Sequence, residues 1–362
     1  MVTGDHEDPD ARRACHGLLT LEGQAMPSTT TAQVAPRKVI ITVAPTGGMA
    51  TKEQSPYLPT QPAEIADQVA ECVEQGASIA ALHARRPGDD AATCNPDVYA
   101  RINELVRDRC DVVINNSTGG GVDGDMIKAY DTGELRIDFR ERLKGLEAPH
   151  VEMATFDCQT FVISSRAREL VCKTSPRECD EMAARITELG IKPEWEVMSN
   201  ANIVQDCQRL IDAGFDPGPH WVNVVLGLDK AFQGALPYTP RVLHSMVDDL
   251  PAGSELCVSA IGPQQLPATT HALLLGGHLR VGLEDNLYLR RGEKATNVAL
   301  VARAARIVRE LGMEPATPAE ARDILGLKPG VLTERQMRPE PRGDPDRRPA
   351  GIKVTNPRRG SP

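Results

Sequence analysis

Short apolar runs alternate with longer amphipathic segments along the central part of the chain. Most of the longer segments repeat apolar residues at helical spacing, most clearly over residues 61–76 and 296–312. Eight buried strands joined by crossover helices predict an α/β fold, a (β/α)8 TIM barrel, over residues 37–330. A doubly wound open sheet is the alternative. The predicted strands span residues 38–46, 78–85, 111–118, 150–157, 192–199, 220–227, 254–262 and 278–285.

The two ends of the chain show neither the short apolar runs of strands nor the helical spacing of apolar residues. Residues 1–36 mix charged residues with Ser, Thr and Pro, and residues 331–362 are rich in Pro and Arg. Neither segment has enough apolar residues to form a packed core. We therefore expect a disordered N-terminal arm and a disordered Pro/Arg-rich tail on either side of the barrel domain.

Composition narrows the classes of function. The 362 residues carry a formal net charge of −9, whereas proteins that bind nucleic acid or membrane surfaces need a basic face. The apolar runs are shorter than the roughly 20 residues of a membrane helix. The nine cysteines contain no C-x-x-C pair, which argues against a thiolate zinc site. The sequence favours a cytoplasmic protein that acts on a small molecule and binds neither nucleic acid nor membrane.

Polar side chains close almost every predicted strand. Active sites of (β/α)8 barrels lie at this end, where the loops to the helices begin. A polar residue at one isolated strand end is more often a turn former or a cap, but seven such ends would converge on one opening. The residues are Thr46, His83, Arg85, Ser117, Thr118, Thr155, Asp157, Glu196, Ser259, Glu284 and Asp285.

Eight short motifs occur in a fixed order along the predicted barrel. They are T-V-A-P-T-G at 42–47, L-H-A-R at 82–85, S-T-G-G at 117–120, E-M-A-T at 152–155, P-E-W-E-V at 193–197, V-L-G at 225–227, G-G-H-L-R-V-G-L-E-D-N at 276–286 and A-T-P-A-E-A-R-D-I-L at 316–325. With these motifs the chain resembles the β-keto acid cleavage enzymes over about residues 38–327. The resemblance implies a homotetrameric, zinc-dependent barrel that exchanges an acyl unit between a β-keto acid and the co-substrate acetyl-CoA. Its products would be acetoacetate and a new CoA thioester.

The same resemblance implies a metal site. Family members hold Zn2+ with an H-x-H pair on the second strand and with the Glu of a G-[FL]-E-D motif, which here assigns His83 and Glu284 as ligands. The first histidine of the pair falls on Ala81. Because a catalytic zinc normally has three protein ligands, water, substrate oxygens or a side chain from a nearby loop must complete the shell, or the reaction proceeds without metal.

Three other histidines are poorly placed to supply the missing ligand. His220 and His278 begin their predicted strands, at the opposite end of the barrel, and His271 lies in a predicted helix. Two other classes of function therefore stay open. One is a metal-independent lyase or isomerase on the same barrel, and the other is a barrel that binds a ligand without catalysis.

The predicted catalytic residues are Arg280, Asp285, Glu196 and Ser117. Cleaving a carbon–carbon bond beside a ketone requires a group that moves protons and fixed donors for the carboxylate and the developing oxyanion. Strand alternation places Arg280 and Glu284 on one face, and Asp285 follows, where it can orient Arg280 or act as a base. Glu196 is expected to be desolvated with a raised pKa, and Ser117 to hold an anion. The structural alternatives are a helix cap for Asp285 and a salt bridge for Glu196.

Further residues are predicted to bind substrate. The backbone of Gly119 and Gly120 is suited to an anion, and Thr155 offers a hydroxyl group. Arg85 is expected to pair with Glu196 or with the substrate.

Two features bear on the substrate range. By the family resemblance, Met49 occupies the position of a Glu that suits a substrate ammonium group, so an uncharged or differently functionalised β-keto acid is expected. Residues 122–149 form a long connection that either covers the opening as a lid or makes a surface hairpin around residues 131–133.

Overall fold

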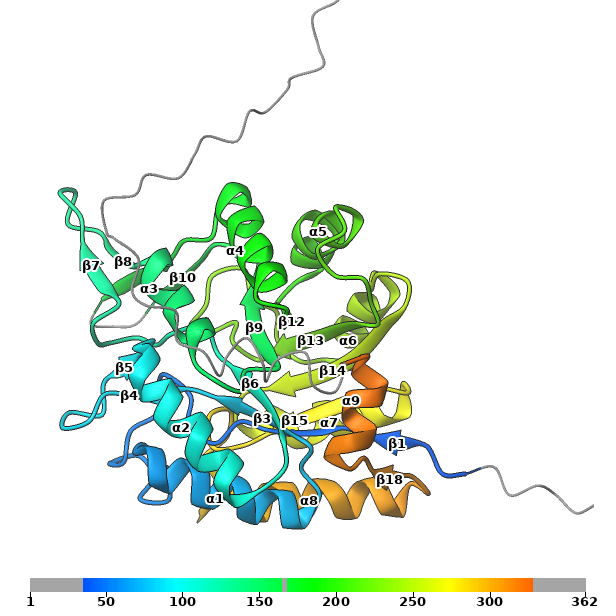
Figure 1. The fold of residues 1–362 in the computed structure, drawn as a ribbon. Helices are drawn as coiled ribbons and strands as arrows, with labels where there is room; N and C mark the ends of the chain where they lie inside the picture. Colours follow the sequence, from blue (N-terminus) through cyan, green and yellow to red (C-terminus); the bar gives the residue numbers. More distant parts are fainter. Residues whose placement is uncertain (1–34, 165–167, 328–362) are drawn as a thin grey trace, which may run out of the picture. The chain divides into compact units, whose positions relative to one another are not determined.

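Eight parallel strands form a closed barrel in the order β12-β13-β14-β15-β2-β3-β6-β9 (Figure 1). The computed structural model describes residues 35–164 and 168–327. The TIM-barrel prediction is confirmed and the open-sheet alternative is wrong, because the first and last strands of the order pair with each other. The strands are β2 (Ile41–Val43), β3 (Ile79–Leu82), β6 (Val113–Asn116), β9 (Met153–Asp157), β12 (Lys192–Val197), β13 (His220–Leu226), β14 (Ser254–Ala260) and β15 (His278–Val281). Apart from residues 35 and 36, the predicted arm and tail lie outside the described residues.

Helices pack around the barrel, and several begin with strong sequence signals. Ser175 and Glu178 form a capping box at the start of α4, as Thr317 and Glu320 do at the start of α9. A proline in the first turn follows each of these caps. The helices are α1 (Pro62–Gln75), α2 (Pro96–Arg109), α3 (Phe139–Leu143), α4 (Pro176–Glu188), α5 (Gln208–Asp212), α6 (Pro240–Asp248), α7 (Gln265–Leu274), α8 (Asn297–Glu310) and α9 (Pro318–Leu325).

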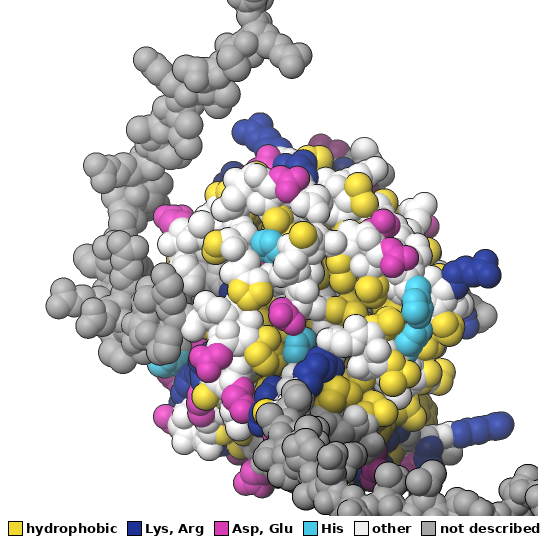
Figure 2. Space-filling view, turned by 90° about the vertical axis from the view of Figure 1, so that its right-hand side faces the viewer, with side chains coloured by type: hydrophobic (Ala, Val, Ile, Leu, Met, Phe, Trp, Pro, Cys, Tyr) yellow, Lys and Arg dark blue, Asp and Glu magenta, His cyan; other side chains and the backbone are white. Residues whose placement is uncertain are grey.

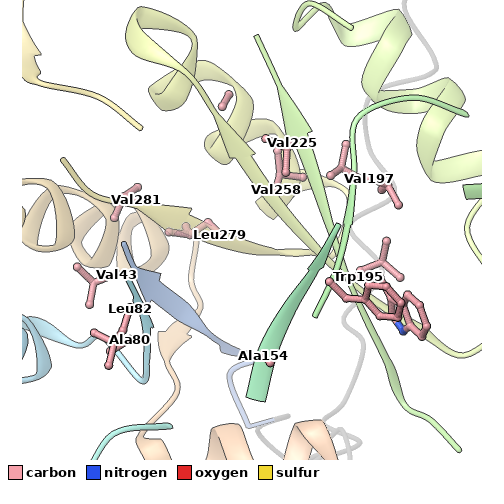
Figure 3. Close-up of a cluster of buried hydrophobic side chains, with 14 of the residues drawn as sticks. Val43, Ala80, Leu82, Ala154, Trp195, Val197, Val225, Val258, Leu279 and Val281 are labelled. Atoms are coloured by element: carbon pink, nitrogen blue, oxygen red, sulfur yellow. The ribbon is translucent and has the colours of Figure 1, made fainter. Parts of the chain in front are cut away.

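The main hydrophobic core surrounds the barrel strands. Val43, Leu82, Val197 and Leu279 are at most 2% exposed, and Figure 3 shows them beside their strands. Burying a Val or Leu side chain contributes about 1.5–3 kcal/mol each. This packing fixes the strands that carry the polar residues of the site.

A second, smaller core closes the amino-terminal end of the barrel. Inward-facing side chains such as Trp221 and Met153 pack there against Leu325 of α9. Arg322, also on α9, donates to the carboxylates of Glu152 and Asp111. In addition β1 (Lys38–Val39) pairs with β18 (Glu314–Pro315). Because this end is filled, a ligand site in the barrel must lie at the carboxyl ends of the strands.

Additional hairpins and a small sheet surround the carboxyl ends of the barrel strands. The connection 122–149 contains a hairpin of β7 (Ile127–Ala129) and β8 (Leu135–Ile137), so the hairpin predicted around residues 131–133 is present. It continues into a four-stranded sheet with β10 (Phe161–Ser164) and β11 (Glu169–Cys172), at the upper left of Figure 1. Two smaller hairpins are β4 (Ala84–Arg85) with β5 (Ala92–Thr93), and β16 (Tyr288–Arg290) with β17 (Glu293–Lys294).

The last barrel strand is shorter than predicted. β15 ends at Val281, so Glu284 and Asp285 lie in the turn that follows rather than on the strand. Gly282 permits this turn, because a Cβ atom there would lie 2.0 Å from the carbonyl oxygen of Ala44. The backbone of the turn therefore packs directly against the end of β2.

The surface carries charges of both signs. Figure 2 shows acidic, basic and apolar side chains interspersed on the face that it draws. Over residues 35–164 and 168–327, none of the helices has the length and apolar composition needed to cross a membrane.

Candidate active site

A cavity of about 700 Å³, part of it open to solvent, lies at the carboxyl end of the barrel. Its polar lining consists of His83, Ser117, Asp157, Glu196, Arg280, Glu284 and Asp285, and its glycine-rich edge of Gly48, Gly119, Gly120 and Gly121. Its apolar lining consists of Met49, Val122, Phe161, Ile163, Met198, Val225, Leu228, Phe232 and Ile261. All four predicted catalytic residues therefore face one space, together with both predicted metal ligands.

Arg280 is the centre of the polar lining. Its Nη1 donates to Glu196 Oε1 at 2.8 Å, and its Nη2 donates to Glu284 Oε1 at 2.5 Å. Its Nε and Nη2 also donate to the two oxygens of Asp285, at 3.1 and 3.0 Å. Such a two-pronged contact fixes the plane of a carboxylate. We call Arg280, Glu196, Glu284 and Asp285 the Arg280 cluster.

The two adjacent acids of the turn differ in their affinity for protons. Burial raises the pKa of Asp285 to about 6, although Arg280 opposes the shift. Burial would also raise the pKa of Glu284, but Arg280 and His83 outweigh it and lower the value to about 2. Glu284 is therefore a permanent anion, whereas Asp285 can accept a proton near neutral pH.

Glu196 and Asp157 form a second carboxylate pair. They are register partners on β12 and β9, and both side chains line the cavity. Burial raises the pKa of both groups, and neighbouring acids raise that of Glu196 further. The expected upward shift for Glu196 is thus present, and its salt bridge to Arg280 coexists with it.

Asp157 was predicted among the polar strand ends at the opening but without a chemical role, whereas its partner Arg142 was not predicted at all. Arg142 is fully buried and places Nη2 3.4 Å from Asp157 Oδ2, while it also donates to the carbonyl oxygen of Thr118. Its position at the polar end of a strand is the signal that identified Asp157. Arg142 could not be found in this way, because it comes from α3 in the long connection and no periodicity links it to the barrel.

Ser117 and the glycines that follow it form the anion side of the cavity. The Gly119 amide donates to Ser117 Oγ at 3.0 Å. Thr155 Oγ1 also donates to Ser117 Oγ, at 3.2 Å, and accepts from the Thr118 amide. Thr155 does not line the cavity, so it positions Ser117 rather than meeting the substrate as predicted. The Ser117 hydroxyl keeps its own hydrogen for a ligand.

Arg85 does not make the predicted contact with Glu196. Its guanidinium donates to the carbonyl oxygens of Gly47, Ala50 and Asp90 at 2.8–3.0 Å. It is 2% exposed and does not line the cavity, so the predicted pairing with Glu196 is wrong. Arg85 holds the backbone of the loop that carries Met49. Met49 itself lines the cavity and is 44% exposed.

The donor set does not complete the zinc shell implied by the resemblance. His83 Nε2 lies 3.4 Å from Glu284 Oε1, and Glu284 Oε2 is buried without a hydrogen-bond partner. The position of the third ligand is the buried methyl group of Ala81. No group of three His, Cys, Asp or Glu side chains within the described ranges is arranged to hold a metal ion. Two ligands fall short of the usual three, so the residues present do not fit a catalytic zinc site.

Comparisons with known proteins identify the family of the chain. The family description "beta-keto acid cleavage enzyme" matches residues 38–327. The chain is 35% identical over 293 residues to the 3-keto-5-aminohexanoate cleavage enzyme of Fusobacterium nucleatum, covering 80% of this chain and 98% of that protein. It is 30% identical over 298 residues to the 3-dehydrocarnitine:acetyl-CoA trimethylamine transferase of Rhizobium meliloti, covering 80% and 97%.

A solved structure supports the fold. The complex of ObcA with oxaloacetate superposes with a TM-score of 0.61 at 20% identity, covering 75% of this chain and 68% of that one. The family match spans the whole barrel and includes every residue of the cavity. The chain therefore belongs to the beta-keto acid cleavage enzyme family.

Proposed function

We propose that this enzyme exchanges an acyl unit between a β-keto acid and acetyl-CoA, giving acetoacetate and a new acyl-CoA. The family establishes an enzyme that cleaves β-keto acids. The names of several relatives, such as the 3-oxoadipate:acetyl-CoA acetyltransferase of Cupriavidus necator, include acetyl-CoA. The observation that carries the proposal is the Arg280 cluster, which holds the carboxylate of Asp285 at the edge of one cavity.

The proposed reaction begins with a proton transfer. Asp285 removes a proton from the carbon between the ketone and the carboxylate of the β-keto acid, and the resulting carbanion attacks the thioester carbonyl of acetyl-CoA. The CoA thiolate leaves and adds to the ketone carbon of the original acid. The bond between that carbon and the former carbanion then breaks. The original acyl group departs as its CoA thioester, and the released acetoacetate carbanion regains the proton from Asp285.

Each neighbouring residue has a separate role in this scheme. Arg280 orients Asp285 and keeps it ionised before the transfer. Ser117 Oγ–H and the Gly120 amide bind the substrate carboxylate, and the Gly119 amide orients Ser117 Oγ. Glu196, whose pKa burial and neighbouring acids raise well above its usual value, carries a proton and donates a hydrogen bond to the oxyanion that develops on the ketone.

The cavity lining favours a β-keto acid with an uncharged, apolar side chain. Phe161 and Phe232 stack with ring centroids 5.0 Å apart, and both line the cavity beside Leu228. Met49 stands where a carboxylate would be needed to balance an ammonium group. A charged side chain would lose its hydration at this wall without gaining a partner.

Incubation with acetyl-CoA and a panel of neutral, cationic and anionic β-keto acids tests the proposal. Mass spectrometry should find acetoacetate and a new acyl-CoA, with neutral acids used best. The Asp285→Asn variant is the matched control. Complete absence of acetoacetate across the panel would favour a lyase, an isomerase or a non-catalytic barrel instead.

Metal assistance, assembly and location stay predictions. If His83 and Glu284 are ligands, purified protein should contain a divalent ion such as Zn2+ that His83→Ala loses. Metal that persists in this variant rules out the assignment. Light scattering tests the expected tetramer, and fractionation of cells tests the expected cytoplasmic location.

A further inference from the structure

A second groove, of about 1760 Å³ and open to solvent, adjoins the cavity. The two spaces share Met49, Leu228, Ile261, Glu284 and Asp285 as lining residues. A long ligand in the groove can therefore place one end beside the proposed base. In the proposed reaction the β-keto acid occupies the cavity, and no ligand has been assigned to the groove.

The inner part of the groove is apolar. Ile261, Leu266 and Leu287 line it, and Leu266 is 38% exposed although it is a large aliphatic residue. Tyr288 and Met49, at 45% and 44% exposed, belong to the same lining. Exposed apolar side chains that gather in one concave place are typical of a binding site rather than of an ordinary surface.

The outer part of the groove is basic. The β16–β17 hairpin brings Arg290 and Arg291 to its rim, and Arg303 of α8 lines it as well. Arg290 pairs with Glu293, whereas Arg291 makes no hydrogen bond or ion pair with the described residues. This group of cations stands out on a chain whose net charge is −9. An anion at the rim would meet guanidinium groups that suit phosphate oxygens.

The hairpin is held in place by contacts that do not involve Arg291, one of them from Arg303 to the carbonyl oxygen of Leu289. Lys294 Nζ donates to the Tyr288 hydroxyl at 2.8 Å and to the carbonyl oxygen of Gln54 at 2.6 Å. It also lies 4.1 Å from the centroid of the Tyr288 ring. The hairpin is thus bonded to the loop before α1, and this contact fixes the position of the turn that carries Arg290 and Arg291.

We propose that this groove binds the CoA co-substrate, with the pantetheine arm along Leu266 and Leu287 and the phosphates at Arg290 and Arg291. The assignment rests on the proposed function, which requires a CoA thioester beside Asp285. An apolar passage that ends in cations matches the order of groups in CoA, from the thioester through the flexible arm to the phosphorylated nucleotide. Met49, shared by both spaces, then lies where thioester and keto acid meet.

Calorimetry with CoA on the full chain tests the groove without any keto acid. The double variant Arg290→Ala, Arg291→Ala should weaken CoA binding on the order of tenfold, because charge-assisted bonds to phosphate are lost. The loss should shrink at high salt. Arg241→Ala, an exposed arginine of α6 outside the groove, is the matched control and should bind CoA normally.

A second pair of variants tests the apolar part. Leu266→Asp and Leu274→Asp both change exposed leucines of α7, but only Leu266 lines the groove. Leu266→Asp should raise KM for both acetyl-CoA and S-acetylpantetheine, whereas the arginine double variant should raise it for acetyl-CoA alone. Melting temperatures check that each variant is folded.

The outcomes separate this inference from the proposed function. If CoA affinity is unchanged in both the double arginine variant and Leu266→Asp, the groove does not bind CoA, even if acetoacetate is formed. CoA binding that depends on these residues, without acetoacetate from any keto acid, supports the groove and removes the proposed reaction.

Discussion

Two clusters of charged side chains lie at opposite ends of the barrel, and they differ in balance. At the amino-terminal end, Arg107 and Arg322 share Glu152 and Asp111, so two cations meet two anions. We call these residues the Arg322 cluster. In the Arg280 cluster at the other end, one guanidinium meets three carboxylates.

The difference extends to individual atoms. Both oxygens of Glu152 accept hydrogen bonds from arginines. In contrast, Glu284 Oε2 has no partner among the described residues and Glu284 faces a cavity. A cluster whose charges and lone pairs are satisfied holds elements together, whereas one with surplus anions and a free oxygen is prepared for a ligand or a proton. We therefore expect the first cluster to affect stability and the second to affect turnover.

The largest effect is expected for Asp285→Asn. As the proposed base, Asp285 needs its charge, so turnover should fall on the order of a hundredfold or more. The alternative role of Asp285 as a helix cap is wrong, because the next helix, α8, is capped by Thr296. Steady-state kinetics and a thermal melt measure both quantities, and the melting temperature should hardly change.

Near-normal turnover of Asp285→Asn would remove the proposed base. Arg280→Lys provides the companion test, because lysine cannot reproduce the two-pronged contact with Asp285. It should lose turnover to a similar extent.

In the Arg322 cluster, a substitution should lower stability and leave turnover unchanged. Arg322→Ala leaves Glu152, 12% exposed at its side chain, with one guanidinium instead of two. The free energy of unfolding should fall by about 2 kcal/mol, less than for a fully buried pair. Denaturant titration measures this change, and kcat on a confirmed substrate should stay at the parent value. A drop in kcat without loss of stability contradicts the division between the two clusters.

Ala81→His should add a ligand to the unbalanced cluster. Ala81 lies on β3, two residues before His83, which directly follows the strand, so the two side chains are expected to share the inward face. A histidine there completes a set of three with His83 and Glu284, and divalent-ion affinity should rise on the order of tenfold or more. Cobalt titration followed by its visible absorption reports the binding directly, with Ala81→Leu as a control for bulk. Equal cobalt affinity in parent and variant excludes this geometry.

The smallest effect is expected at the apolar edge of the cavity. Met49→Glu introduces a carboxylate where the parent has a thioether, so amino-bearing β-keto acids should gain severalfold in kcat/KM relative to neutral ones. Competition between two such acids, read by mass spectrometry, measures the ratio. Met49→Gln, which has similar bulk but no charge, should leave it unchanged. An unaltered ratio in Met49→Glu means that residue 49 does not meet the substrate side chain.

The sequence was sufficient to predict the barrel and the centre of its site. Periodicity locates the eight strands, because each is buried and the connections between them carry helices. The spacing of Arg280, Glu284 and Asp285 is local, so their mutual contacts follow from one strand and one turn.

Contacts between distant segments were not predictable in the same way. An arginine at a strand end looks the same whether it meets substrate or, as Arg85 does, backbone carbonyls of another loop. Thr155 was placed on the correct strand, but its hydroxyl is used by Ser117 and Thr118. These outcomes depend on where loops 30 or more residues away return in space, since Arg85 and Gly47 are 38 positions apart.

The contacts of Arg85 have a consequence for how this enzyme can diversify. Arg85 binds the loop of Met49 through carbonyl oxygens, which every amino acid possesses. The shape of the loop is therefore largely independent of the side chains displayed on it. Position 49 can change during evolution, or in a designed library, without loss of the support beneath it. New side chains can be sampled at the edge of the cavity while the scaffold and the Arg280 cluster remain intact.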